Sequence, residues 1–271
     1  MVGGNESSIT NFILVGLFSE FQHSIVPNSM IIFFYILAFL WNMLLIVLIS
    51  GDSHFHMLMY ILRSQLSVID LMLTSTIIPK MSYNFFTGER TISWIGCGTQ
   101  SFFYLLMGMS ECLILTLIAY DRYVVVCNPL CYPSIMSSRF CLHLIAVCWI
   151  GGSISSFIHT VYPMHFPICG SREILHFFCE VPVLIKLSCE DSSVYQLVVV
   201  VTSIVLLAVP FIFITASYTL IFLTVLRMAP VKGRKKVLVT CSSHLIVVSL
   251  FSGPNIFIYM TFTSSHSPEQ D

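Results

Sequence analysis

The sequence predicts an all-α membrane protein whose helices cross the bilayer. Of its 271 residues, 56% are hydrophobic and 9% are charged, whereas a soluble domain has about 25% charged residues. The apolar runs are long and continuous rather than alternating, which favours helices over the strands of a membrane barrel. This composition argues against a soluble enzyme, and the net charge of −1 gives no indication of nucleic-acid binding.

Six apolar ranges are long enough to cross a membrane, because a helix needs roughly 20 residues to span the hydrocarbon core. We expect the spans at about residues 26–50, 59–80, 98–122, 140–161, 194–226 and 237–262. They make a transmembrane bundle over 26–262, with an extracellular N-terminus at 1–25 and an outer segment at 263–271. Pro79, Pro210 and Pro254 lie inside spans and are expected to kink them.

The basic residues predict that the N-terminus lies outside the cell, because cytoplasmic loops are enriched in Lys and Arg. In this orientation eight of the 12 Lys and Arg residues lie at or near the inner face, and the densest run is 232–236. That run is expected to face anionic membrane lipid. Asn5 opens an Asn-Glu-Ser sequon and is a predicted glycosylation site, although such short sequons also arise by chance.

The most informative motif is Asp121-Arg122-Tyr123, at the end of the third apolar run. Charges are costly in hydrocarbon, so the triplet is expected where the span meets water. Together with its surroundings at 118–133, it resembles the signature at the inner end of the third helix in vertebrate odorant receptors. These are a branch of the rhodopsin-like G-protein-coupled receptors.

Further motifs of the same family follow in family order and at family spacing. They are Phe12–Leu17, His56–Tyr60, Leu66–Asp70, Ile78–Met81, Ser217-Tyr218 and Lys236–Leu245. The resemblance therefore covers nearly the whole chain and implies a rhodopsin-like transmembrane helix bundle in the plasma membrane. It also implies a receptor that binds a small volatile odorant and activates a stimulatory olfactory heterotrimeric G protein.

The chain departs from the family pattern at several points. Trp41 stands where the family usually has glycine before Asn42, and Ser252 replaces a usual tyrosine of the sixth span. Ser267–Asp271 resembles the third outer loop, and the seventh helix that follows it in the family is missing. The sequence thus predicts six of the usual seven helices. It leaves open a truncated, non-signalling receptor fragment or pseudogene product as the alternative.

The resemblance implies that Asp121, Arg122 and Tyr123 form the G-protein coupling switch. Arg122 would be held by Asp121 in the inactive state and freed for the G protein in the active one. Spacing alone does not show this role, because an interfacial ion pair would have the same sequence. The basic run at 232–236 is expected to contact the G protein as well.

Asp70 and Glu111 are the only carboxylates deep in the predicted spans. At 1.5 Å per residue, both are expected roughly 15 Å from the inner face. Equal depth on adjacent helices suggests that they meet, so that they share a proton or hold a cation. The resemblance implies a sodium site beside Asn42, and a protonated, hydrogen-bonded packing pair is the alternative. No other cofactor is expected.

Four cysteines fall in or beside polar outer segments, namely Cys97, Cys169, Cys179 and Cys189. Four cysteines allow three pairings, so the sequence alone does not choose between them. The resemblance implies the bridges Cys97–Cys179 and Cys169–Cys189. His176, Cys179 and Glu180 could be interpreted as metal ligands, but a bridged cysteine is a poor thiolate ligand, and no metal site is expected.

The ligand is expected to bind between the third, fifth and sixth spans. The predicted ligand-binding residues are Tyr104, Leu105, Gly108, Met109, Thr202, Leu206, Asn255 and Tyr259. Tyr104 and Gly108 share a helical face with Glu111. Such a lining is apolar with a few hydroxyls, which suits a small volatile molecule. Helix packing is the alternative for each residue, since Gly and Thr are common at membrane helix interfaces.

A six-span channel or transporter is the alternative of a different class. It would need a pore loop or rings of charge between the spans, and the sequence contains neither. The sequence also contains no nucleotide-binding loop, no His-Glu-x-x-His motif and no arrangement typical of a catalytic triad. An enzyme is therefore not expected.

Overall fold

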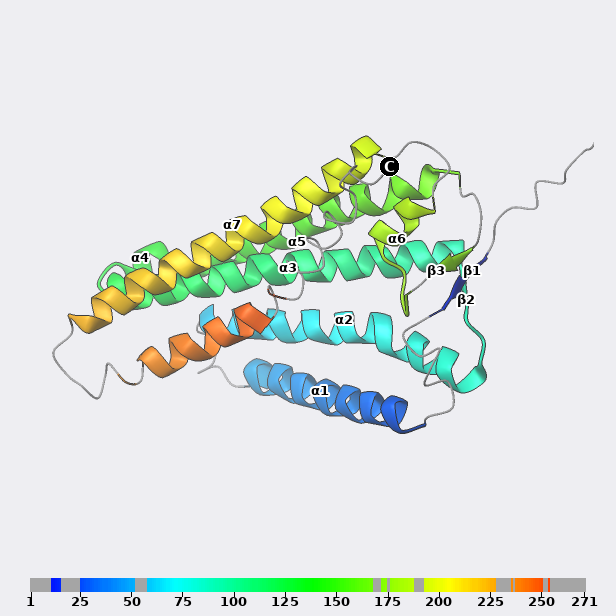
Figure 1. Cartoon of the computed structure of the whole chain (residues 1–271). Coiled ribbons are helices and arrows are strands. Elements are labelled where there is room, and N and C mark those ends of the chain that lie inside the picture. The colour runs from blue at the N-terminus through cyan, green and yellow to red at the C-terminus, as the bar shows by residue number, and fades with distance from the viewer. Residues whose placement is uncertain are drawn as a thin grey trace, which may run out of the picture. The chain divides into compact units, whose positions relative to one another are not determined.

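The computed structural model is dominated by long helices (Figure 1). It describes residues 11–15, 25–51, 58–167, 172–174, 176–187, 193–227, 235, 237–250 and 253. Within these residues, five helices are long and apolar enough to cross a membrane. They are α1 (Ile25–Gly51), α2 (Leu58–Thr87), α3 (Trp94–Cys127), α5 (Ser138–Val161) and α7 (Ser193–Leu226). A shorter apolar helix, Val237–Leu250, lies within the sixth expected span.

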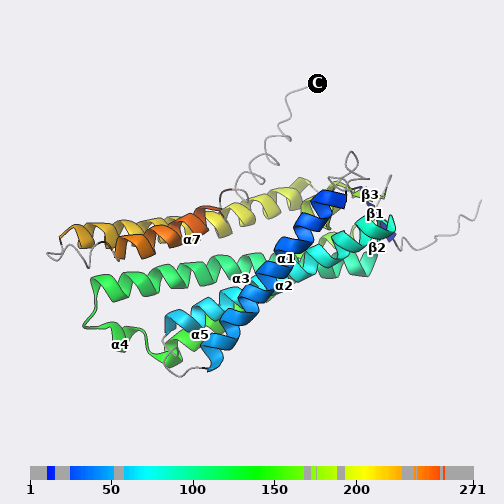
Figure 2. The same cartoon turned by 90° about the horizontal axis from the view of Figure 1, so that it is seen from below.

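Short elements connect the long helices. Figure 2 shows α4 (Tyr132–Ile135) in the connection between α3 and α5. A 3₁₀ turn at Pro163–His165 follows α5, and α6 (Val181–Lys186) precedes α7. Three short strands complete the described elements, namely β1 (Asn11–Leu14), β2 (Thr91–Ser93) and β3 (Glu173–Ile174).

The chain divides into two compact units, and the boundary between them cuts α1, α2, α3 and α5. The first unit is Met1–Ile46, Ser67–Gly108 and Gly152–Ser193. The second unit is Val47–Leu66, Met109–Gly151 and Val194–Asp271. The strands and a disulfide belong to the first unit, and the Asp121-Arg122-Tyr123 triplet belongs to the second.

A three-stranded sheet of order β2-β1-β3 organises the first unit. β1 runs antiparallel to β2, with Phe12 opposite Ile92, and parallel to β3, with Leu14 opposite Ile174. Its backbone donates from Ile13 to the carbonyl of Arg172 at 2.9 Å and from Leu14 to that of Arg90 at 2.8 Å. In the sequence this segment appeared only as a family motif, and no strand was predicted there.

β1 is amphipathic with a period of two, as expected for a strand with one buried face. Phe12 is 1% exposed and Leu14 is 4% exposed, whereas Ile13 between them is 41% exposed. The buried face packs into a cluster with Ile92 of β2 and Ile174 of β3, and the cluster also contains Cys97, Cys179 and Leu184. The N-terminal strand therefore supplies part of the core of the first unit.

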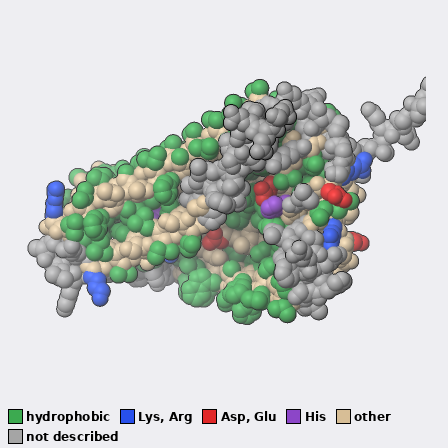
Figure 3. Space-filling view, viewed as in Figure 1, with side chains coloured by type: hydrophobic (Ala, Val, Ile, Leu, Met, Phe, Trp, Pro, Cys, Tyr) green, Lys and Arg blue, Asp and Glu red, His purple; other side chains and the backbone are tan. Residues whose placement is uncertain are grey.

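The core of the second unit lies between α3, α7 and the helix Val237–Leu250. Its α7 residues follow the spacing of one helical face. The cluster consists of Leu115, Ala119, Ile214, Tyr218, Ile221, Val225, Cys241 and Val248. Away from these cores the long helices expose hydrophobic side chains, and Figure 3 shows such side chains spread over the visible face. Trp41 is 66% exposed, so α1 accommodates it on its outer surface where the family usually has glycine.

The packing of β1 leads to a test of its contribution to stability. Phe12→Ala should lower the free energy of unfolding of the purified chain by about 3–5 kcal/mol, because it removes a buried ring. Ile13→Ala is the matched control on the exposed face of the strand and should have a much smaller effect. Thermal unfolding in detergent measures both variants. Equal losses would show that the strand is not packed as described.

Candidate functional site

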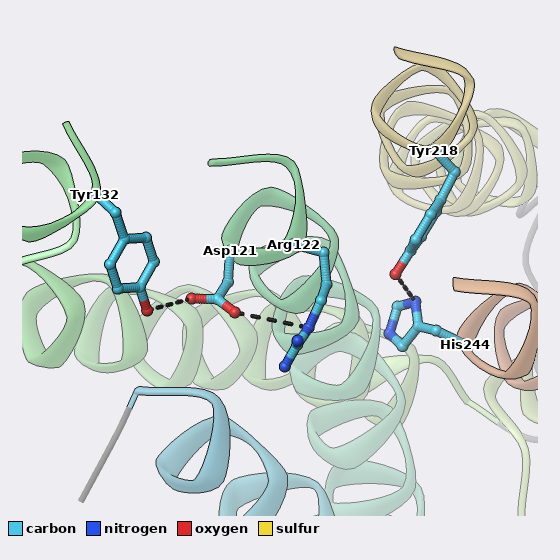
Figure 4. Close-up of polar contacts among 5 residues, drawn as sticks. All are labelled: Asp121, Arg122, Tyr132, Tyr218 and His244. Carbon is cyan, nitrogen blue, oxygen red and sulfur yellow. Dashed lines mark hydrogen bonds and ion pairs between the residues drawn. The ribbon is translucent and has the colours of Figure 1, made fainter. Parts of the chain in front are cut away.

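The Asp121 carboxylate in the second unit has two partners of different kinds (Figure 4). Tyr132 of α4 donates a hydrogen bond to Oδ1 at 2.9 Å, and Arg122 Nε lies 3.8 Å from Oδ2. The Asp121 side chain is 2% exposed and that of Arg122 is 20% exposed. The short phenolic bond holds the buried carboxylate, whereas the ion pair is long and uses a single nitrogen. Arg122 can therefore leave while Asp121 keeps its hydrogen bond to Tyr132.

Tyr132 was not among the residues predicted from the sequence. Pro133 is one of the first two residues of α4, where proline favours helix initiation, and this short helix carries the Tyr132 ring to Asp121. Burial and the Asp121 carboxylate raise the pKa of Tyr132 above its usual value. The phenol therefore remains a protonated donor at neutral pH. The sequence feature that could have indicated Tyr132 is an aromatic residue beside Pro133 soon after the triplet. Spacing alone does not show whether the loop after α3 turns toward Asp121.

A second polar pair joins α7 to the helix Val237–Leu250. The Tyr218 hydroxyl and His244 Nδ1 are hydrogen-bonded at 2.7 Å (Figure 4). Tyr218 is 4% exposed and belongs to the apolar cluster of this unit. His244 Nε2 is buried and has no hydrogen-bond partner among the described residues. In the sequence, both residues appeared only within family motifs, and nothing indicated that they would pair.

The predicted ligand-binding residues are divided between the two units. Tyr104, Leu105 and Gly108 are half-buried in the first unit, and a Cβ placed on Gly108 would meet no atom within 4 Å. Whether this space belongs to a ligand pocket stays a prediction. The Tyr104 ring contacts Phe178 at a centroid distance of 4.8 Å.

For the other predicted ligand residues the structure shows less about a ligand pocket. Met109 and Leu206 are half-buried in the second unit. The Thr202 hydroxyl donates to the carbonyl of Val198 in its own helix at 2.7 Å. Asn255 and Tyr259 lie outside the described residues. The complete ligand pocket therefore remains a prediction.

The two carboxylates expected to meet belong to different units, and their meeting remains a prediction. Asp70 is half-buried in the first unit, and Glu111 is 8% exposed in the second. The Asn42 side chain donates to the carbonyl of Ala38 in its own helix at 3.1 Å. The sodium site therefore also remains a prediction.

The disulfide implied by the resemblance is present in the first unit. Cys97, at the start of α3, is bonded to Cys179, and the two Cα atoms are 5.3 Å apart. The cysteines are 1% and 0% exposed, respectively. Cys169 and Cys189, and the predicted glycosylation site Asn5, lie outside the described residues. Beside the disulfide, Gln100 and Ser101 hydrogen-bond the backbone of Cys179, a contact that the sequence did not predict.

His176 and Glu180 form a half-buried pair next to the disulfide. His176 Nε2 lies 3.3 Å from Glu180 Oε1, and the side chains are 32% and 18% exposed. The imidazole also contacts Phe177 and Phe178, at centroid distances of 4.7 and 5.0 Å. Burial raises the pKa of Glu180 to about 7 and lowers the pKa of His176. Both shifts favour the neutral forms. The pair is therefore better described as a carboxylic acid beside a neutral imidazole than as an ion pair.

This pair predicts that the stability of the segment that carries it depends on pH. The pKa of Glu180 is about 7 in the folded chain against an ordinary 4.5, so the folded state binds more protons between these values and loses stability as pH rises through them. His176 opposes this below its ordinary pKa of 6.5. Glu180→Gln should abolish the decrease with rising pH, and His176→Asn should leave it in place. Proteolysis rates of the 172–187 segment at several pH values test this, and a Glu180→Gln profile equal to wild type would contradict it.

Known proteins similar to the chain point to one family. The family model described as olfactory receptor matches residues 31–269. Human olfactory receptor 2T27 is 46% identical over 271 residues, covering 100% of this chain and 86% of the relative. Human olfactory receptor 2T10 is 45% identical over 267 residues, covering 98% and 86%. The chain therefore belongs to the olfactory receptor family of G-protein-coupled receptors, which are not enzymes, and it is a multi-pass membrane protein with a rhodopsin-like helical bundle.

Proposed function

We propose that this chain is an odorant receptor of the plasma membrane, with its N-terminus outside. It binds a small, mostly apolar volatile molecule and activates a stimulatory heterotrimeric G protein. The observation that carries the proposal is the loosely held Arg122, whose acidic partner keeps a second donor in Tyr132. Relatives named olfactory receptors, 45–46% identical to this chain, support the same class of function.

The character of the ligand follows from the described part of the expected site. Tyr104 supplies a ring and a hydroxyl, and the open space beside Gly108 admits a small group. Phe178 adds a second ring against Tyr104. A lining of rings and aliphatic chains with few polar atoms favours apolar molecules that carry one hydrogen-bonding group.

The different strengths of the two contacts to Asp121 support the proposed coupling to a G protein. The ion pair is long at 3.8 Å, uses a single nitrogen and involves a partly exposed arginine, so it is the weaker of the two contacts. A hydrogen bond to a charged group contributes roughly 1.5–3 kcal/mol. A G protein that offers acceptors to Arg122 therefore competes only with the weaker contact. Asp121 remains satisfied by Tyr132 after Arg122 has left.

The experiment is a cyclic AMP assay in cells that express the chain with a stimulatory olfactory G protein. A panel of small volatile molecules should contain at least one that raises cyclic AMP. Arg122→Ala should reduce that response at least tenfold while surface labelling is unchanged, because the contact to the G protein is lost. A surface-expressed wild-type chain that answers no molecule would refute the odorant function, and a normal response of Arg122→Ala would refute the switch role.

Tyr132→Phe tests the balance at Asp121 separately. Without the phenolic donor, Arg122 becomes the main partner of the buried carboxylate and is held more firmly. The odorant concentration for half-maximal cyclic AMP should therefore rise roughly threefold to tenfold, as expected for a hydrogen bond of this type. Tyr83→Phe makes the same chemical change on an exposed tyrosine of α2, outside the switch motif, and serves as the control. An unchanged Tyr132→Phe would show that the hydrogen bond does not govern the release of Arg122.

A further inference from the structure

We propose that Gln100 is a positioning residue for odorant recognition. Its side-chain amide links the backbone of α2 to the backbone of Cys179 and so sets the place of Phe178 against Tyr104. The inference rests on the proposed odorant function and adds to it a residue one helical turn nearer the start of α3 than the predicted ligand residues. All the residues involved belong to the first unit.

Both ends of the Gln100 amide are used, and both partners are backbone atoms. Nε2 donates to the carbonyl of Thr76 in α2 at 3.0 Å, and Oε1 accepts from the backbone N–H of Cys179 at 3.1 Å. Gln100 is 6% exposed. A primary amide is the side-chain group that donates at one end and accepts at the other without carrying charge. At this degree of burial, a charged group would need compensation.

Ser101 completes the contact from the next position of α3. Its hydroxyl donates to the carbonyl of Cys179 at 3.0 Å, and the residue is 1% exposed. The N–H and the C=O of Cys179 are therefore both bonded to side chains of α3. The disulfide to Cys97 fixes the sulfur of Cys179 but still allows rotation about the side-chain bonds. The two hydrogen bonds are what orient the backbone at this residue.

The Thr76 carbonyl lies in a turn of α2 that Pro79 disturbs. Proline has no N–H, so the carbonyl of Ser75, four residues before it, loses its helical donor. The proline ring also opens the preceding turn of a helix. Gln100 bonds the Thr76 carbonyl in this turn and so links α3 to it. The turn of α2 before Pro79 thus supplies the first anchor for the segment that carries Cys179.

The orientation of Cys179 decides where the adjacent aromatic side chain lies. Phe178 is 4% exposed, and its ring is 4.8 Å from that of Tyr104. Tyr104 follows Gln100 by one helical turn on α3 and is a predicted ligand residue. Gln100 therefore lies on the same helical face as Tyr104, one turn nearer the start of α3, where its amide is bonded to backbone atoms. It acts through the Phe178–Tyr104 contact rather than by touching the odorant.

The first arm of the test measures hydrogen exchange at the Cys179 amide in the purified full chain, with no odorant present. Gln100→Met removes the acceptor and should accelerate exchange roughly threefold to tenfold, as expected for one lost hydrogen bond. Gln100→Glu keeps an acceptor for this N–H, and Ser101→Ala changes only the carbonyl side, so both should exchange more slowly than Gln100→Met. Unchanged exchange in Gln100→Met would overturn the proposal.

The second arm measures cyclic AMP responses to a homologous series of odorants of increasing chain length. Gln100→Met should raise the half-maximal concentrations by unequal factors across the series at an unchanged surface level, because the Phe178–Tyr104 wall has moved. A uniform loss in proportion to surface level would make Gln100 merely structural and overturn the role. A wild type that gives no cyclic AMP response to any odorant, although hydrogen exchange at Cys179 depends on Gln100, would overturn both the proposed odorant function and the recognition role of Gln100.

Discussion

Hydrocarbon cannot hydrogen-bond, and this constraint governs both the backbone and the polar side chains of the chain. The backbone satisfies it by forming long helices across the expected spans. Hydroxyl side chains satisfy it locally, as Thr74 donates to the carbonyl of Asp70 at 2.7 Å and Thr215 to that of Phe211 at 2.8 Å. Polar groups that cannot bond their own helix must find partners on other elements. Those longer-range contacts are where recognition and switching can be built.

The long helices were predictable because their signal is local. Continuous apolar runs of membrane length identify them whatever their neighbours are. That the Asp121-Arg122-Tyr123 triplet lies where α3 meets water stays a prediction. The strand β1 was not predictable in the same way. It has four residues, and its pairing partners lie about 80 and 160 positions away in the sequence. Its stability comes from the burial of Phe12 and Leu14 in a distant cluster, and a four-residue window contains no sign of that cluster.

The same distinction applies to the candidate site. Cysteine positions, together with the family resemblance, indicated the Cys97–Cys179 bridge that the structure contains. They did not indicate Gln100, because a single glutamine in an apolar helix has no pattern that names its partners. Tyr132 was missed for a similar reason, since its role depends on the direction in which the loop after α3 turns. Sequence patterns identify residues whose chemistry is unusual for their surroundings, whereas partnerships depend on packing.

Gln100 and Asp121 are both buried polar groups with two partners each, yet they suit opposite tasks. The partners of Gln100 are backbone atoms. One belongs to the helix α2 and the other to Cys179, which the disulfide holds, so neither can leave without local unfolding. The partners of Asp121 are side chains, and the arginine is partly exposed and loosely held. A buried group with two backbone partners fixes a position. A buried group with one firm and one weak side-chain partner can release the weak one at little cost, which is the property that a molecular switch requires.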